Sequence, residues 1–242
     1  MNEIRIAWGV TGSGTFIRDI FKLMLELKSR FKEFKISTYL SRAAEEVIRI
    51  YGLLKYLNLI SPGGYYEEVI TEDIAGKSCV YSGRFNMGRY RMLVIAPATS
   101  NTVAKIVYGI ADTIVTTIAA QALKSNTPLL ILPSDVSTET EVPCYIDRVI
   151  CNKCMRCINI CPYNAIELID EYPRINLLKC YGCRVCEENC PVNAIKCFHK
   201  IRITIRDIDS ENIKRLTMMN NVTVVDNVRE LESKILELAG VK

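Results

Sequence analysis

The stretch Cys151-Asn-Lys-Cys-Met-Arg-Cys-Ile-Asn-Ile-Cys161-Pro162 decides one part of the fold, because it recurs as Cys180-Tyr-Gly-Cys-Arg-Val-Cys-Glu-Glu-Asn-Cys190-Pro191. Both runs have the spacing C-x2-C-x2-C-x3-C-P, and the second begins 29 residues after the first. Each proline is followed by one residue and then by Asn-Ala-Ile. Of the 11 cysteines, all except Cys79 lie within residues 144–197. In a cytosolic protein such a cluster indicates a metal centre rather than disulfides.

The spacing of the two runs predicts two [4Fe–4S] clusters. Three thiolates in a tight loop hold three corners of one cubane, and the fourth cysteine of the run reaches the other cluster. We therefore expect one cluster on Cys151, Cys154, Cys157 and Cys190, and the other on Cys180, Cys183, Cys186 and Cys161. Structural zinc is the alternative, but zinc takes four ligands as two separated pairs and does not explain a doubled run with proline after each fourth cysteine.

The segment 144–200 resembles the bacterial two-cluster ferredoxins through these two runs. The resemblance leaves three cysteines without a role. We interpret Cys79, Cys144 and Cys197 as buried small hydrophobic residues or idle thiols.

The remainder of the chain alternates strand and helix patterns. Before the cysteines we expect strands at 4–8, 34–40, 92–96 and 129–132 and helices at 15–31, 43–50 and 103–124, the last with a candidate interruption at Gly109. After them we expect strands at 201–205 and 222–225, a helix capped by Ser210 and running to Met219, and a helix at 227–238. This alternation predicts an α/β domain with a flavodoxin-like or Rossmann-like parallel sheet. We predict a first domain of residues 1–143 and 201–242, interrupted by a ferredoxin domain at 144–200; a ferredoxin with its own short appendage is the alternative.

Composition narrows the class of protein. The chain has 242 residues, of which 49% are hydrophobic and 24% are charged, so disorder, a coiled coil and a collagenous chain are excluded. A net charge of +4 is too small to indicate nucleic acid. No apolar run approaches the ~18–20 residues of a membrane span. The N-terminus lacks a basic region followed by an apolar one, so we expect a cytoplasmic protein that does not bind a membrane.

Three polar loops follow predicted strands, where open parallel sheets bind their ligands. In the first, Thr11-Gly-Ser-Gly14, glycines allow close approach of the backbone, and the helix N-terminus that follows favours an anion. The order Gly9-x-x-Gly12-x-Gly14 is not the dinucleotide fingerprint, and the second strand ends in hydroxyl side chains rather than in an acid that would hold an NAD ribose. The pattern favours a monophosphate such as FMN, with a plain tight turn as the alternative.

Each of the other loop residues also has a purely structural interpretation. In the second loop, Pro97-Ala-Thr-Ser-Asn-Thr102, Asn101 and Thr102 can cap the following helix. The third loop, Pro133-Ser134-Asp135, can be a simple strand end, and Ser41 can be a helix cap.

Taken together, these segments resemble the flavoprotein family of the homo-oligomeric FMN-containing cysteine decarboxylases. The resemblance rests on Gly9-Val-Thr-Gly-Ser-Gly14, Pro97 to Thr102, Tyr108-Gly-Ile-Ala-Asp112, and the tail segments 211–215 and 222–225. It implies an FMN site and assembly as a homotrimer or a multiple of trimers, with FMN near a subunit boundary. The residues implied in cofactor binding are Thr11, Gly12, Ser13, Gly14, Ser41, Pro97, Thr99, Ser100, Asn101 and Thr102.

The pairing with a ferredoxin resembles a narrower group, the archaeal iron–sulfur flavoproteins, which includes archaeoflavoproteins and dihydromethanopterin reductases. Tyr81-Ser-Gly-Arg-Phe85 and Leu40-Ser-Arg-Ala-Ala-Glu-Glu46 are also similar to that group. The resemblance implies reduction of the pterin 7,8-dihydromethanopterin, with electrons from a ferredoxin-like donor. The alternative is an electron-transfer flavoprotein that has no organic substrate.

The decarboxylase activity itself is not expected. Those enzymes use a histidine in the first domain, whereas the only histidine here is His199, which lies beyond the second cysteine run and which we interpret as a surface or interface residue. No catalytic side chain is identified from the sequence. Basic residues beside the cysteines, which could attract an acidic ferredoxin, are Lys153, Arg156, Lys179 and Arg184; for each residue taken alone, a plain solvated side chain is the preferred interpretation.

Overall fold

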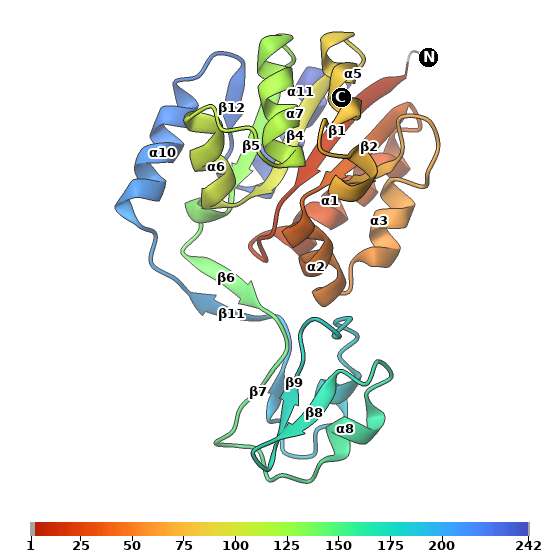
Figure 1. Cartoon of the computed structure of the whole chain (residues 1–242), viewed down its shortest axis with the longest axis vertical. Coiled ribbons are helices and arrows are strands. Elements are labelled where there is room, and N and C mark those ends of the chain that lie inside the picture. Colours follow the sequence, from red (N-terminus) through yellow and green to blue (C-terminus); the bar gives the residue numbers. More distant parts are fainter. Residues whose placement is uncertain (1–2, 242) are drawn as a thin grey trace.

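The structure, a computed structural model, describes residues 3–241 and contains an α/β domain joined to a smaller cysteine-rich domain (Figure 1). The six strands of the central sheet are β1 (Ile4–Val10), β2 (Phe34–Leu40), β3 (Val69–Thr71), β4 (Met92–Ala98), β5 (Leu129–Pro133) and β12 (Val222–Val224). Their order across the sheet is β12-β5-β4-β1-β2-β3, and all pairs are parallel. Strands β1, β2 and β3 follow one another in one direction and β4, β5 and β12 in the other, so the order reverses between β1 and β4, which is the position where open α/β sheets bind ligands.

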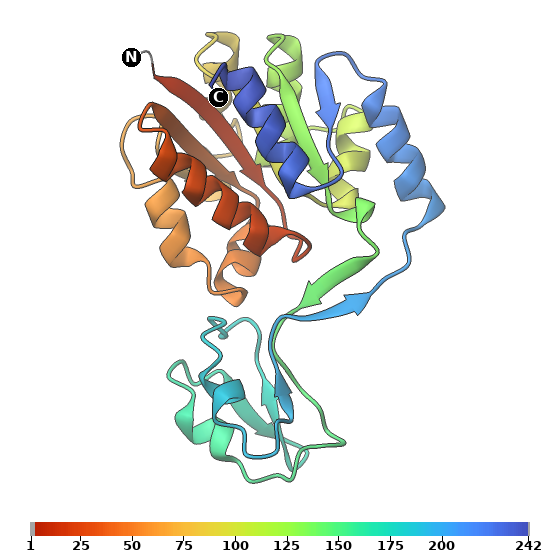
Figure 2. The same cartoon turned by 180° about the vertical axis from the view of Figure 1, so that it is seen from behind.

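Helices cover both faces of this sheet (Figures 1 and 2). One face carries α1 (Ile17–Arg30), α2 (Arg42–Ile50), α3 (Leu54–Ile60) and α11 (Val228–Ala239). The other carries α4 (Glu72–Ala75), α5 (Gly83–Asn86), α6 (Ser100–Val107), α7 (Ile114–Lys124) and α10 (Asp207–Thr217). Because successive strand residues point to opposite faces, Trp8 of β1 joins the first core and its neighbour Ala7 joins the second. No helix among residues 3–241 is both long and apolar enough to span a bilayer.

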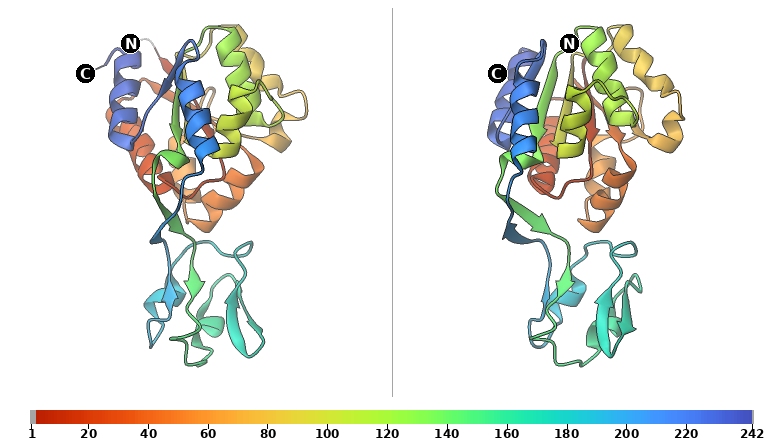
Figure 3. Two further views of the ribbon diagram at one scale, coloured as in Figure 1. Left: turned by 90° about the vertical axis from the view of Figure 1, so that its left-hand side faces the viewer. Right: turned by 60° about the vertical axis from the view of Figure 1, so that its left-hand side comes forward.

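The cysteine-rich domain lies beyond the carboxyl ends of the sheet strands (Figure 3). Two antiparallel linker strands, β6 (Glu139–Val142) and β11 (His199–Arg202), connect it to the α/β domain. It contains the hairpin β8–β9, the strand pair β7–β10 and two short helices; the bounds are β7 (Tyr145–Ile146), α8 (Arg156–Ile160), β8 (Ile166–Ile169), β9 (Tyr172–Ile175), α9 (Val185–Glu188) and β10 (Ile195–Lys196). The chain then returns to the first domain, where β12 pairs with β5.

Several expected elements differ in detail. The helix expected over 103–124, with Gly109 as its candidate interruption, is two helices: the chain turns at Gly109, whose φ is +70°, and α7 begins anew with Thr113 as its N-cap. Strand β4 continues to Ala98, which pairs with Pro133, instead of ending before Pro97. Ser210 is not a helix cap: α10 begins at Asp207, one turn earlier, and Ser210 lies inside it.

The interpretation of Cys144 and Cys197 as idle thiols is wrong. Antiparallel pairing of β7 with β10 places the two residues opposite each other, with Cα atoms 3.9 Å apart, and they form a disulfide. This bond joins the two ends of the cysteine-rich domain, which spacing alone did not indicate. Cys79 is a buried free cysteine in the core, as expected.

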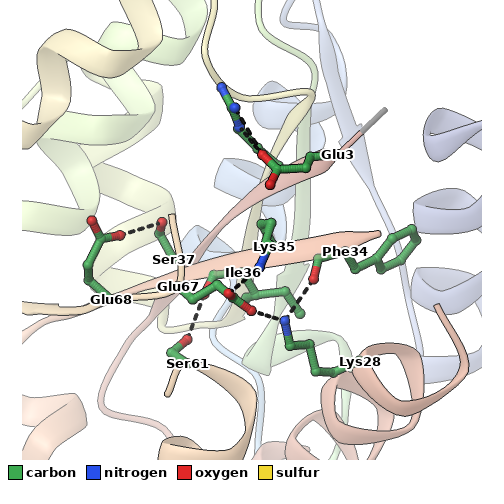
Figure 4. Close-up of polar contacts among 10 residues, drawn as sticks. Glu3, Lys28, Phe34, Lys35, Ile36, Ser37, Ser61, Glu67 and Glu68 are labelled. Carbon is green, nitrogen blue, oxygen red and sulfur yellow. Dashed lines mark hydrogen bonds and ion pairs between the residues drawn. The ribbon is translucent and has the colours of Figure 1, made fainter. Parts of the chain in front are cut away.

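A buried ion cluster ties α1 to the edge of the sheet (Figure 4). Glu67, 7% exposed, accepts hydrogen bonds from Lys28 of α1 and from Lys35 of β2, the latter at 2.5 Å. Lys28 also donates to the carbonyl of Phe34 at 2.8 Å. Burial would raise the pKa of the Glu67 carboxyl, but the hydrogen bonds and charges of the two lysines outweigh it and hold the pKa below 4.5.

Candidate functional site

The two cysteine runs fold into matching loops, as their repeated spacing predicts. Left-handed backbone occurs at equivalent positions of both: Lys153 (φ +58°) matches Gly182 (φ +59°), and Met155 (φ +55°) matches Arg184 (φ +65°). In each run the third cysteine, Cys157 or Cys186, lies in the short helix that follows and is buried. Left-handed residues turn the chain sharply, so each loop folds back on itself.

The structure places Cys161 with the opposite run. Cys161, Cys180, Cys183 and Cys186 line one cavity. Next to them, Tyr163, two residues after Cys161, stacks on Tyr181 with ring centroids 4.4 Å apart. The pKa of Cys186 agrees with this grouping. Burial and the nearby thiols of Cys180, Cys183 and Cys161 raise the pKa of Cys186 to about 12. Burial also raises the pKa of Cys157, and there the neighbouring thiols are Cys151 and Cys154 of its own run.

These residues fit an iron–sulfur cluster. Grouped thiols with raised pKa values ionise only when a cation compensates their charge, which iron would do. Backbone amides point at the sulfurs of the fourth cysteines: Ala165 donates to Cys161 at 3.3 Å and Ala194 to Cys190 at 3.2 Å, and hydrogen bonds of this kind are found at cluster sulfurs. Among residues 3–241, no three His, Cys, Asp or Glu side chains gather closely enough for a single metal ion.

Most of the basic residues beside the cysteines are paired with acids. Lys153 contacts Glu171 at 3.2 Å, Lys179 contacts Glu167 at 2.7 Å, and Arg184 contacts Glu187 at 2.8 Å. These pairs reduce the positive field that the sequence indicated, so they weaken the argument for electrostatic attraction of an acidic donor.

The first polar loop is held to the second by Thr11. This side chain is 2% exposed, donates to the carbonyl of Pro97 at 2.7 Å and accepts from the amide of Thr99 at 2.9 Å. Strand neighbours β1 and β4 end here, so the two loops lie side by side at the reversal of the sheet. The Thr11 hydroxyl thus links the two strand-end loops.

The glycines of the first loop are required by packing against the protein itself. A Cβ on Gly12 would lie 2.5 Å from the Cβ of Ala43, at the start of α2. A Cβ on Gly14 would overlap the hydroxyl of Tyr51 and approach the carbonyl oxygen of Glu141 at 2.9 Å. Sequence reasoning did not single out Tyr51, because an aromatic residue after a helix carries no recognisable signal of such a contact.

Serines around the first loop also cap local structure. Ser13 accepts a hydrogen bond from the amide of Thr15 at 3.2 Å. Ser41 is the N-cap of α2 and accepts from the amide of Ala44 at 3.2 Å, which confirms its interpretation as a helix cap. Both side chains stay partly exposed.

In the second loop the cap is Thr99, so the structural alternative for Asn101 and Thr102, that they cap the helix, is wrong. Thr99 accepts from the amide of Thr102, because its extended backbone places its hydroxyl ahead of the first turn of α6. Ser100 is half-buried and Asn101 is exposed, while Thr102 is 6% exposed with its hydroxyl 3.0 Å from that of Thr99. The Asn101 side chain is therefore exposed and does not act as the helix cap.

Two further features of the sequence analysis are the Tyr81–Phe85 motif and His199, and the structure places both outside the strand-end loops. Arg84 of the Tyr81–Phe85 motif pairs with Glu68 at 2.8 Å and lies over the ring of Tyr66, a member of the second core. His199 is exposed on the linker strand β11.

Comparison with known proteins agrees with this architecture. Residues 1–144 match the family model described as Flavoprotein, and residues 150–200 match the 4Fe-4S dicluster domain. A protein of Methanosarcina mazei named dihydromethanopterin reductase (acceptor) is 44% identical over 94% of this chain and 97% of its own. A Methanocaldococcus jannaschii protein of the same name is 42% identical over 95% and 94%. The crystal structure of Burkholderia xenovorans DmrB in complex with FMN has a TM-score of 0.63 and 28% identity, covering 97% of this chain and 94% of that one.

Fold and site thus define an iron–sulfur flavoprotein: a parallel α/β flavoprotein domain carrying a dicluster ferredoxin domain. The chain belongs to the Flavoprotein family, in the group whose archaeal members are named dihydromethanopterin reductase (acceptor). The predicted α/β fold class and the resemblance to archaeal iron–sulfur flavoproteins are confirmed.

Proposed function

We propose that this chain uses FMN and two [4Fe–4S] clusters to reduce 7,8-dihydromethanopterin to tetrahydromethanopterin, with electrons from a low-potential donor such as ferredoxin. The observation that carries the proposal is the identity of 44%, over nearly the whole chain, to a protein named for that reaction. When bound, the clusters pass single electrons, and FMN collects two of them for transfer as hydride. The chain supplies the geometry that brings these two chemistries together.

The protein's own residues have two tasks in this proposal. The cysteine loops hold one cluster on Cys151, Cys154, Cys157 and Cys190 and the other on Cys180, Cys183, Cys186 and Cys161. The strand-end loops hold FMN, with Ser13, Ser41, Ser100 and Asn101 as polar contacts and Thr11 and Thr99 holding the loops in place. We assign no proton-donating side chain.

An anaerobic mixing experiment tests the proposed reaction. Chemically reduced holoprotein, mixed without oxygen with 7,8-dihydromethanopterin, should regain the absorbance of oxidised flavin. Tetrahydromethanopterin is the matched control and should leave the spectrum of the reduced protein unchanged. NADH and NADPH should reduce the oxidised protein poorly, because the first loop lacks the dinucleotide fingerprint. If the dihydropterin leaves the flavin reduced while the protein exchanges electrons rapidly between ferredoxin and a second flavoprotein, the chain is an electron carrier.

A second prediction concerns the flavin site. Mass spectrometry of the extracted cofactor should give FMN and not FAD. Asn101→Ala should weaken FMN retention while changing the free energy of unfolding by less than ~0.5 kcal/mol, because Asn101 is exposed and does not cap α6. Thr99→Ala is the matched control and should cost ~1 kcal/mol as a lost cap. Full FMN retention in Asn101→Ala would remove this residue from the site.

We further propose a cytoplasmic homo-oligomer, a trimer or a multiple of trimers. Support comes from the related Burkholderia protein, which is described as a cubic protein cage for redox transfer. Light scattering of the holoprotein measures this assembly directly.

A further inference from the structure

The two domains touch at the corner that follows α2. Tyr51 is 5% exposed, and its hydroxyl meets Gly14 of the first polar loop and donates to the carbonyl of Glu141 at 2.5 Å. Its ring stacks on Phe198 at 5.2 Å between centroids. The next residue, Gly52, lies against the backbone of Gly182, in the loop between Cys180 and Cys183. One short segment therefore contacts both the predicted flavin loop and one cysteine loop.

Only one of the two repeats is shaped for this contact. Gly182 and Lys153 occupy equivalent positions with nearly the same φ, +59° and +58°. The backbone conformation therefore tolerates a side chain. At Gly182, however, a Cβ would overlap the carbonyl oxygen of Ile50 and lie 2.9 Å from the amide nitrogen of Gly52. Contact with the flavoprotein domain, rather than the loop's own conformation, accounts for glycine here.

Arg49 strengthens the same contact. Its guanidinium donates to the carbonyl of Leu178 and lies 5.8 Å from the ring centroid of Tyr181. In the other repeat, the position equivalent to Leu178 is Val149, which is 96% exposed. The Cys180 loop is thus docked on α2, whereas the chain ahead of Cys151 faces solvent.

We infer that the cluster bound by Cys180, Cys183, Cys186 and Cys161 is the inner one, which passes electrons to the flavin, and that the cluster of the Cys151 loop is the outer one, which receives them. This inference rests on the proposed cofactors. Each transfer oxidises the donor protein by one electron. Two such transfers, together with two protons from water, reduce one FMN. Arg49, Gly52 and Gly182 act as positioning residues that hold the inner cluster against the Tyr51 corner.

Two variants of the holoprotein test the order of the clusters. Gly182→Ala and Arg49→Gln should both slow flavin reduction after mixing with a reduced bacterial two-cluster ferredoxin, by an amount on the order of 10-fold. Iron and FMN contents should stay at the wild-type level. Hydrogen exchange at residues 51–53 should become faster, which reports docking independently of turnover. Gly88→Ala, with φ +60° and open space around a Cβ, controls for backbone strain, and Arg42→Gln on α2 controls for lost charge.

The rates of flavin reduction and of hydrogen exchange together support or overturn the proposed order of the two clusters. Slower reduction with faster exchange in the two docking variants, and neither in the controls, supports the inference. A wild-type rate in both variants overturns it, whether exchange changes or not, because electrons then reach the flavin by another route such as a neighbouring subunit. The proposed reaction is judged separately: once chemically reduced, the flavin of these variants should be reoxidised by 7,8-dihydromethanopterin at the wild-type rate.

Discussion

Replacing Cys161 with alanine should destroy the cluster bound by the other cysteine run and leave the cluster of its own run intact. The physical reason is its position, because Cys161 shares a cavity with Cys180, Cys183 and Cys186, and Tyr163 stacks on Tyr181. Wild-type protein prepared without oxygen should contain about eight iron and eight sulfide per chain, and the variant should keep one intact [4Fe–4S] cluster with about four iron. Iron analysis and the electron paramagnetic resonance of the reduced protein measure both.

Double variants show which cluster is lost. Cys161→Ala combined with Cys183→Ala removes two ligands from the same cluster and should leave the other one intact. Cys161→Ala combined with Cys154→Ala damages both clusters and should leave none intact. The reverse pattern would show that each run binds its own cluster. Cys79→Ala, at a buried cysteine outside both runs, is the control and should retain about eight iron.

Replacing Glu67 with glutamine should lower the free energy of unfolding by about 2–3 kcal/mol. The substitution leaves the ammonium groups of Lys28 and Lys35 without their charged partner in a largely buried cluster. Urea unfolding at neutral pH measures the loss. Glu26→Gln, which breaks the exposed 3.9 Å pair with Lys22, is the matched control and should change stability by less than ~0.5 kcal/mol.

The same variant should have a distinct pH dependence. Because the pKa of Glu67 is lower in the folded protein than its ordinary value of 4.5, the carboxylate stabilises the fold fully above that value. As the pH falls through the folded pKa, the carboxyl takes up a proton and this contribution is lost. The difference in stability between wild type and Glu67→Gln should therefore be constant near neutral pH and shrink below about pH 4.5. A difference that grows on acidification would contradict the ion pair.

Features that depend on local spacing can be predicted from the amino-acid sequence. Cysteines at fixed intervals followed by proline define the ferredoxin loops, because cluster ligation requires short, tight turns. Alternating apolar strands and helices similarly define the parallel sheet, and the strand-end loops mark its ligand edge. Ser41 could be recognised as a cap because capping involves only neighbouring residues along the chain.

Tertiary structure alone decided the features that depend on residues distant in sequence. The pairing of Cys144 with Cys197 follows from the register of β7 and β10, and Glu67 finds Lys28 and Lys35 only after α1 packs on the sheet. Gly14, Tyr51 and Gly182 carry no common pattern, yet packing brings the Tyr51–Gly52 corner against both glycines. Short-range spacing constrains a loop's own shape, whereas the surface that the loop meets is selected by the burial and steric fit of the whole molecule.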